Sequence, residues 1–217
     1  DDALRLKDSG KMLHVFTEEE TNSLKELMLC KHPNWEILFR LYHDQKLNPM
    51  SFLRSEEFLN ILTECCIKDY PYTPFADAFH TMRSMLLPVL YLMGSEVPKA
   101  DVYHAICTGY GGLLACLGGH VYKKKVLLTE HGIYTREREE EIIRAKWVQP
   151  AFKKQWISFF YMLSDIIYTR AFLVSALFTN AMHAQIQMGC DKEKCRVVEN
   201  GINYERLSPI PLKEEDG

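Results

Sequence analysis

From Gly94 onward, short apolar runs rich in Val, Ile and Leu alternate with segments of helical length. This alternation is typical of βαβ units, in which helices connect parallel strands of one sheet. The predicted strands are residues 101–107, 125–129, 171–176 and 195–199. The predicted helices are residues 111–117, 136–146, 150–168 and 179–188. The sequence therefore predicts an α/β domain with a parallel sheet over residues 94–208, followed by a disordered tail over 209–217.

Residues 1–93 have a different pattern, which predicts four successive helices and no strand. Thr17 and Glu20 have the spacing of a capping box, and apolar residues recur at helical intervals after them. Further helices are predicted over 35–45 and 55–68. Thr73 and Pro74 predict the start of a fourth, with Thr73 as its cap and Pro74 at its first position. We interpret residues 1–93 as a helical segment or insertion ahead of the α/β domain.

Composition excludes several classes of partner. The formal net charge of −3, from 26 basic and 29 acidic residues, gives no excess of positive charge for nucleic acid or an anionic membrane surface. Seven cysteines form an odd set without CxxC spacing, which indicates a reducing, cytoplasmic compartment. The most apolar long stretch, 156–178, contains Asp165 and Arg170, so a soluble helix followed by a buried strand is favoured over a membrane span.

Polar and glycine residues follow two of the predicted strands. In open α/β sheets, ligands bind at the carboxyl ends of the strands. After 101–107 come Thr108, Gly109 and Tyr110, a Gly-rich turn whose backbone N–H groups could approach a phosphate or a sugar hydroxyl. Glycines there would equally serve a tight turn or close packing of helix on sheet.

After 125–129 come Glu130, His131 and Gly132. An imidazole at this place can change protonation near neutral pH or donate a hydrogen bond to a sugar oxygen, and Gly132 would let a substrate approach the backbone. The alternative is a histidine bonded to a neighbouring loop carbonyl. Arg136 and Arg138 could pair with phosphates, but a solvated helix start with alternating charges is the favoured interpretation.

Other motifs give weaker signals. His104, inside the first predicted strand, is interpreted as a buried imidazole with a hydrogen-bond partner rather than as a ligand. Cys190 and Cys195 would need two further ligands to hold zinc. The chain has no GxSxG, HExxH or GxxxxGK[ST] motif, so hydrolase, metalloprotease and P-loop functions are not supported.

Three stretches together resemble a known family: ADVYHAICTGYGGLLACLGG (100–119), KVLLTEHGIYTREREEEI (125–142) and CRVVENGIN (195–203). They are similar to the amino-terminal domain of family 4 retaining glycosyltransferases, and more narrowly to PelF-type enzymes of bacterial exopolysaccharide synthesis. The resemblance covers roughly residues 100 to 205. Asn203 stands where an Asp is usual, and Glu199 where a Pro is common.

The resemblance implies a GT-B architecture, in which two Rossmann-like domains face one cleft. The amino-terminal domain would hold a glycan acceptor and the second domain a nucleotide-sugar donor resembling UDP-glucose. His131 would then act as the catalytic residue beside the donor sugar. Thr108, Gly109, Tyr110, Glu130, Gly132, Arg136 and Arg138 would contact the substrates. The family reaction needs no metal and no other cofactor.

The resemblance also implies that parts of such an enzyme lie outside these 217 residues. Those parts are a first strand with its Gly-rich loop and the whole donor domain. We therefore expect residues 1–217 to be inactive alone and strand 101–107 to have an unpaired edge, which would support a homodimer unless an amino-terminal helix covers it.

Two other functions remain open. The chain could be a non-catalytic interaction module or scaffold in a membrane-associated polysaccharide synthase. An independent nucleotide-binding Rossmann protein is disfavoured, because no strand is followed by GxGxxG. The length of the parent reading frame separates enzyme from scaffold. About 200 further residues, a typical domain length, with an E-x7-E motif would favour the enzyme.

Overall fold

The computed structural model describes residues 14–201 and 204–209. Its centre is a sheet of four parallel strands in the order β1-β2-β3-β4. The strands are β1 (Val102–Ala105), β2 (Lys125–Glu130), β3 (Leu173–Ala176) and β4 (Cys195–Val197). This arrangement confirms the predicted α/β fold and all four predicted strands, and it is Rossmann-like. Three strands are shorter than predicted, while β2 extends one residue further, to Glu130.

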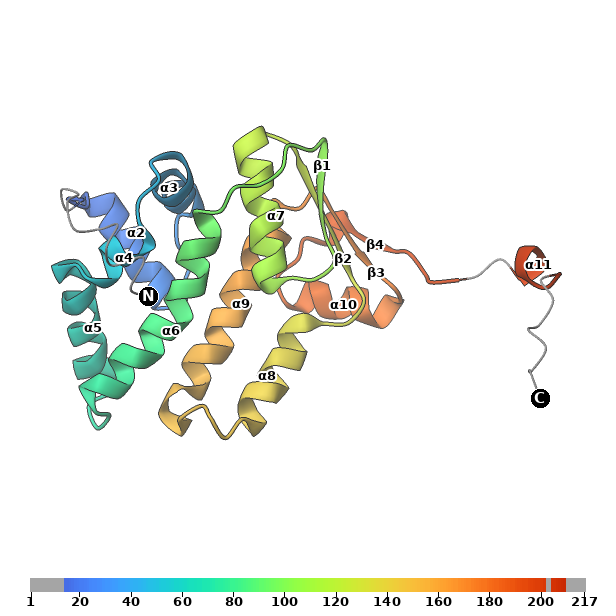
Figure 1. The fold of residues 1–217 in the computed structure, drawn as a ribbon. Coiled ribbons are helices and arrows are strands. Elements are labelled where there is room, and N and C mark those ends of the chain that lie inside the picture. Colours follow the sequence, from blue (N-terminus) through green and yellow to red (C-terminus); the bar gives the residue numbers. More distant parts are fainter. Residues whose placement is uncertain (1–13, 202–203, 210–217) are drawn as a thin grey trace, which may run out of the picture.

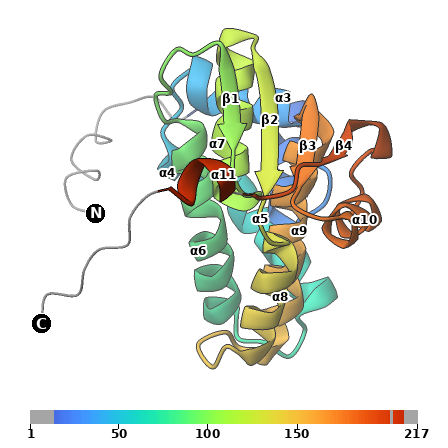
Figure 2. The same ribbon diagram turned by 90° about the vertical axis from the view of Figure 1, so that its right-hand side faces the viewer.

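The strands are connected by the helices α7 (Gly109–Tyr122), α8 (Tyr134–Arg144), α9 (Lys153–Arg170) and α10 (Thr179–Gln187). Helices α7, α9 and α10 pack on the sheet, whereas α8 packs against α9. The 3-10 turns η2 (Pro150–Phe152) and η3 (Lys192–Lys194) precede α9 and β4, and α11 (Tyr204–Leu207) follows β4. Helices α7 and α9 lie on the same side of the strands in Figure 1 and behind them in Figure 2.

Side chains alternate along the strands between the face covered by helices and the opposite face. Val126 and Leu128 point toward α7 and α9 and are buried. Close packing requires glycine on α7, because a Cβ at Gly118 would overlap the ring of Tyr103. On the opposite face of β1, Val102 and Ile106 are exposed by 46% and 68%. A parallel sheet is usually covered on both faces, so this face is unusually open.

Strand β1 lies at the edge of the sheet, because β2 is its partner on one side and no described strand pairs with its other side. This position agrees with the prediction of an unpaired edge at 101–107. Self-association through that edge stays a prediction.

The helical segment consists of α2 (Glu18–Met28), α3 (Trp35–Phe39), the π-helix η1 (Arg40–Asp44), α4 (Pro49–Leu53), α5 (Glu56–Asp69) and α6 (Phe75–Met93). The predicted helix over 35–45 is thus α3 continued by a π-helical turn. The five-residue helix α4 was not predicted, because its length gives no periodicity. It begins where the Asn48 side chain accepts a hydrogen bond from the N–H of Met50.

The start of α6 differs from its prediction. The helix begins at Phe75, with Pro74 as an N-cap residue that has no side-chain cap. Thr73 does not cap the helix, because it belongs to the preceding turn, where its N–H donates to the carbonyl of Tyr70. By contrast, the capping box at Thr17 and Glu20 is confirmed, with both reciprocal hydrogen bonds present.

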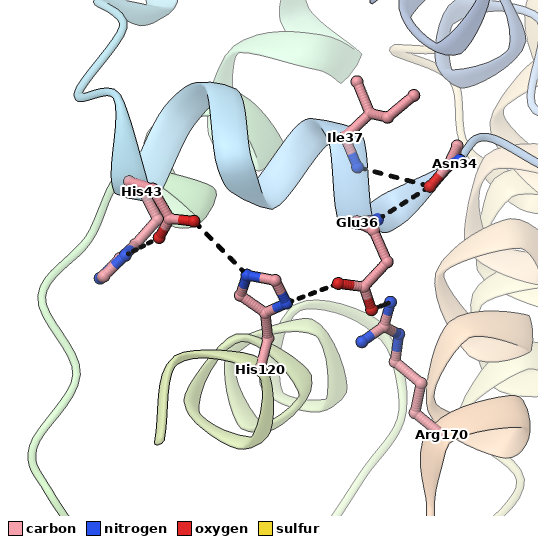
Figure 3. Close-up of polar contacts among 7 residues, drawn as sticks. Asn34, Glu36, Ile37, His43, His120 and Arg170 are labelled. Atoms are coloured by element: carbon pink, nitrogen blue, oxygen red, sulfur yellow. Dashed lines mark hydrogen bonds and ion pairs between the residues drawn. The ribbon is translucent and has the colours of Figure 1, made fainter. Parts of the chain in front are cut away.

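The helical segment and the sheet domain share one apolar core, which continues from Phe16 to Cys195. An ion-pair network at the surface of this joint adds polar contacts (Figure 3). Glu36 of α3 pairs with Nδ1 of His120 on α7 at 2.8 Å and with Arg170 on α9 at 2.5 Å. Nε2 of His120 lies 3.8 Å from Asp44, which also contacts His43 at 3.1 Å.

Candidate functional site at the carboxyl edge of the sheet

The parallel register brings the ends of β1 and β2 to the same edge, because Ala105 pairs with Leu128. The turn after β1 contains Thr108 and begins α7 at Gly109. The turn after β2 contains His131 and Gly132 and leads into α8 at Tyr134. The two stretches that carry the sequence resemblance therefore lie side by side, as the predicted topology requires.

A buried chain of hydroxyl groups ties these two turns together. Ser164 on α9 donates a hydrogen bond of 2.8 Å to Oγ1 of Thr108, and its oxygen lies 2.7 Å from Oγ1 of Thr135 on α8. All three side chains are buried. Buried hydroxyl groups stabilise a fold only when they have hydrogen-bond partners. The three linked hydroxyl groups therefore fix the two turns relative to α9.

Gly109 allows the two turns to approach closely. Its φ is +67°, in the left-handed region that favours glycine. A Cβ at this position would lie 2.5 Å from Cε1 of Tyr134. Tyr110, the next residue, packs against Phe159 and Phe160 of α9. Burial raises the pKa of the Tyr110 phenol to about 12.

Glu130 lies inside the fold and not in an open cleft. Its side chain points to the helix-covered face, where Oε2 accepts hydrogen bonds of 2.7 Å from Tyr168 and 3.0 Å from Nε2 of Gln185. Burial raises the pKa of this carboxyl group, although the hydrogen bonds of Tyr168 and Gln185 and the backbone N–H of Tyr134 oppose the shift. In the described structure Glu130 therefore joins β2 to α9 and α10.

The Glu130 cluster retains unused hydrogen-bonding capacity. Oε1 of Glu130 and Oε1 of Gln185 are both buried and have no hydrogen-bond partner among the described residues. Both are acceptors when Glu130 is ionised, whereas a protonated carboxyl group can donate a hydrogen bond. The unpaired acceptors and the burial of the carboxyl group act in the same direction and raise the pKa of Glu130.

His131 contrasts with Glu130, because its side chain is exposed. No hydrogen bond or ion pair engages its imidazole within residues 14–201 and 204–209. Gly132 beside it is also exposed, and the carboxylate of Glu137 occupies the place where a Cβ at Gly132 would project. The structure therefore leaves both nitrogens of His131 available to a ligand.

The two arginines of the motif have different surroundings. Arg138 pairs with Glu141 at 2.5 Å and lies over the ring of Tyr134 at 5.3 Å. Arg136 is exposed and has no ion pair in the described part of the chain. Arg138 is therefore half-buried and paired within the helix start, whereas the guanidinium of Arg136 is solvated and has no ion pair among the described residues.

Three helices that begin at this edge lack a capping side chain. The N-cap residues of α7, α8 and α10 are Thr108, Ile133 and Phe178, and none of them makes a side-chain cap hydrogen bond. The first N–H groups of a helix have no partner within it and carry partial positive charge. Such helix starts suit an anionic group of a ligand.

Sequence reasoning missed several residues that build this edge: Tyr134, Thr135, Ser164, Tyr168 and Gln185. Tyr134 and Thr135 lie within the motif string and could have been found there. The other three belong to helices with no distinguishing local pattern, and only the fold brings them to the edge.

Two polar features lie outside the edge itself. His104 is exposed rather than buried, since it points to the open face of β1, and its Nε2 lies 2.9 Å from Oγ1 of Thr129. Cys190 and Cys195 are both buried, with their sulfur atoms 3.4 Å apart.

Within the described residues, no group of three or more His, Cys, Asp or Glu side chains is placed to hold a metal ion. None of the described helices has the length and apolar character needed to cross a membrane.

Comparison with known proteins gives one match. A family model described as "Domain of unknown function (DUF3492)" matches residues 4–193. No curated protein and no solved structure matches the chain.

Proposed function

The chain belongs to the DUF3492 family, and we propose that it forms the acceptor-side, Rossmann-like half of a retaining glycosyltransferase. This enzyme, of the family 4 and PelF-like type, would transfer a sugar from a nucleotide-sugar donor to a glycan acceptor. The observation that carries the proposal is that the imidazole of His131, at the carboxyl end of β2 and within the motif TEHGIYTRER, is exposed and has no partner among the residues that the structure describes.

The surroundings of His131 support this chemistry. In sugar transfer, the bond between the anomeric carbon and the diphosphate oxygen breaks, and a bond to an acceptor hydroxyl forms. The hydroxyl proton passes to the departing diphosphate. Positioned donors that stabilise the developing negative charge lower the barrier. The uncapped start of α7 and the exposed guanidinium of Arg136, which has no ion pair among the described residues, would supply such donors at the same edge as His131.

The remaining motif residues have supporting roles in the proposal. Thr108 and Gly109 hold the first turn of α7 against α8, and Glu130 holds the end of β2. Tyr110 contributes mainly through its packing on α9. Most contacts to the nucleotide belong, in the resembled family, to a second domain that residues 1–217 do not include. We propose that transfer requires both halves.

The test is the substitution His131→Ala in the enzyme that comprises both halves. We expect transfer from UDP-glucose to fall at least ~100-fold, the contribution of a positioned proton-transfer or hydrogen-bonding group. The melting temperature should stay unchanged, because the side chain is exposed. His183→Ala, at another exposed histidine, on α10, is the matched control. Unchanged turnover in His131→Ala would refute the role of this residue.

A second measurement tests the division of labour. Residues 1–217 alone should show no transfer from UDP-glucose, and calorimetric titration of the two-domain protein with a panel of nucleotide sugars should identify the donor. Transfer by the 217-residue chain alone would overturn the proposal that both halves are needed.

A further inference from the structure

A groove lies between α6 and the connection from α8 to α9, away from His131. Its volume is about 480 Å³. Helix α6 contributes Asp77, His80 and Arg83, and the other wall contains Trp147, Gln149 and Trp156. We call this the tryptophan groove. Its volume falls in the range of small-molecule sites, roughly 300–1,000 Å³.

Trp147 gives the groove an exposed aromatic surface. The side chain is 66% exposed, although tryptophan is among the most costly residues to leave in water. Its ring meets that of Trp156 edge to face at 5.7 Å, and Trp156 in turn stacks on Phe160 of the core. The exposed ring is therefore supported from the core, as the platform of a binding site would be.

The polar side chains of the groove have unused hydrogen-bonding capacity. Asp77, His80 and Arg83 make no side-chain hydrogen bond or ion pair within the described residues. Other charges of the same segment are paired, such as Lys25 with Glu64 at 2.6 Å and Lys46 with Glu96 at 2.6 Å. Asp77 and Arg83 have opposite charges, so the groove offers both donors and acceptors and no net charge.

A second hollow shares Trp147 and extends the surface toward the candidate site. It is lined by Glu137, Arg138, Glu141 and Arg144 of α8 together with Trp147. Helix α8 begins just after His131, and its 11 residues span ~16 Å at 1.5 Å per residue. The two hollows therefore meet at Trp147, and α8 runs from the carboxyl edge of the sheet toward them.

We propose that the tryptophan groove binds sugar units of the glycan acceptor. A pyranose ring has an apolar face of C–H groups and a rim of hydroxyl groups that each donate and accept. The aromatic platform of Trp147 matches the face, and Asp77, His80, Arg83 and Gln149 match the rim. The choice of a glycan rests on the proposed function.

Intrinsic fluorescence can test the proposal directly. The chain has three tryptophans, of which Trp35 is buried while Trp147 and Trp156 line the groove. We would titrate the 217-residue chain with α-1,4- and β-1,4-linked glucose oligomers, N-acetylglucosamine oligomers and galacturonate oligomers. At least one series should give a saturable change, with affinity that increases with oligomer length up to the span of the groove.

Two variants locate the binding. Trp147→Ala should weaken glycan binding at least tenfold, measured by saturation-transfer NMR so that the loss of a fluorophore does not matter. Arg83→Ala should weaken it less. Tyr72→Ala is the matched control, because Tyr72 is a 99% exposed aromatic residue outside the groove. All three side chains lie at the surface, so melting temperatures should agree.

The outcomes separate this proposal from the proposed function. Absence of binding for every glycan, or equal binding by wild type and Trp147→Ala, would overturn the tryptophan groove as a glycan site. If the two-domain enzyme transfers sugar while Trp147→Ala leaves the acceptor KM unchanged, the groove proposal fails and the function stands. If glycans bind through Trp147 but no nucleotide sugar is used, the groove stands and the transferase proposal fails.

Discussion

The helical segment and the carboxyl edge of the sheet use their polar side chains in opposite ways. In the segment, α2, α3, α4 and α5 each begin with a side chain that caps the helix, from Thr17, Asn34, Asn48 and Ser55, and α6 is the exception. At the edge, α7, α8 and α10 begin without one. The joint between the two parts pairs Glu36 with His120 and Arg170, whereas His131 at the edge has no partner in the described structure.

This difference separates polar groups that stabilise the chain from those left for a ligand. A cap or an ion pair contributes to folding and is then unavailable to other molecules. The edge is stabilised instead from beneath, by the hydroxyl chain through Ser164 and by the contacts of Glu130. We infer that stability at the edge comes from buried contacts, while its surface donors stay free.

The largest effect should come from the buried contacts of the edge. Glu130→Ala removes the acceptor for Tyr168 and Gln185 and leaves a cavity, so we expect a loss of ~3 kcal/mol in the free energy of unfolding. Urea denaturation measures it. A loss in the free energy of unfolding smaller than that of a typical surface substitution would contradict the structural role of Glu130.

The conservative variant Glu130→Gln gives a pH signature. Burial raises the folded-state pKa of Glu130 above the ordinary value of a glutamate carboxyl group. Its contribution to stability is therefore fully present below the unfolded pKa and is lost as pH rises through the folded pKa. Glu130→Gln cannot ionise, so it should remove this decline in denaturation measured from acid to mildly alkaline pH. If the wild type and Glu130→Gln had the same dependence of stability on pH, ionisation of Glu130 would not be the cause of the decline.

Gly109→Ala should have the next largest effect. A methyl group there forces a left-handed φ on alanine and presses on the ring of Tyr134, at a combined cost of ~2 kcal/mol. Gly189→Ala is the control, because that residue also has a positive φ but no atom within 4 Å of its Cβ position. Equal losses in both variants would show that contact with Tyr134 contributes nothing.

In the helical segment, removing a cap should have a smaller effect. Ser55→Ala loses the hydrogen bond from the N–H of Phe58 at 3.1 Å, which we expect to cost ~1 kcal/mol. Thr63→Ala, at an exposed position inside the same helix, should be neutral or slightly stabilising, because alanine favours helices. Thermal unfolding measures the stability of both variants. A larger loss of stability in Thr63→Ala than in Ser55→Ala would contradict the role of the cap.

The smallest expected effect on stability concerns the edge of β1. Val102→Lys places a charge on a half-exposed strand that lacks a partner on one side, so stability should change by less than ~0.5 kcal/mol. If two chains pair through this edge, the lysine should shift the dimer toward monomer in sedimentation velocity. A dimer unaffected by Val102→Lys would place the contact elsewhere.

The sequence predicted the elements whose signal is local. The four strands are runs of apolar residues long enough to recognise, and the capping box at Thr17 involves residues three positions apart. The prediction failed where the signal was short or ambiguous, as at α4 and at Thr73. For the candidate site, the motif predicted that His131 follows the end of β2, and the Gly-rich turn predicted that the end of β1 lies at the same edge.

The α/β alternation, the parallel sheet and the stretch that carries His131 could be predicted from the sequence, because they depend on neighbouring residues and on periodicity. The inward direction of Glu130 and the outward direction of His131 became known from the fold, since two adjacent residues of a strand end point to opposite sides. Only the fold also showed that Ser164, Tyr168 and Gln185 support the edge, and that Trp147 lies opposite α6. Those contacts join residues far apart in the chain, and no local pattern encodes them.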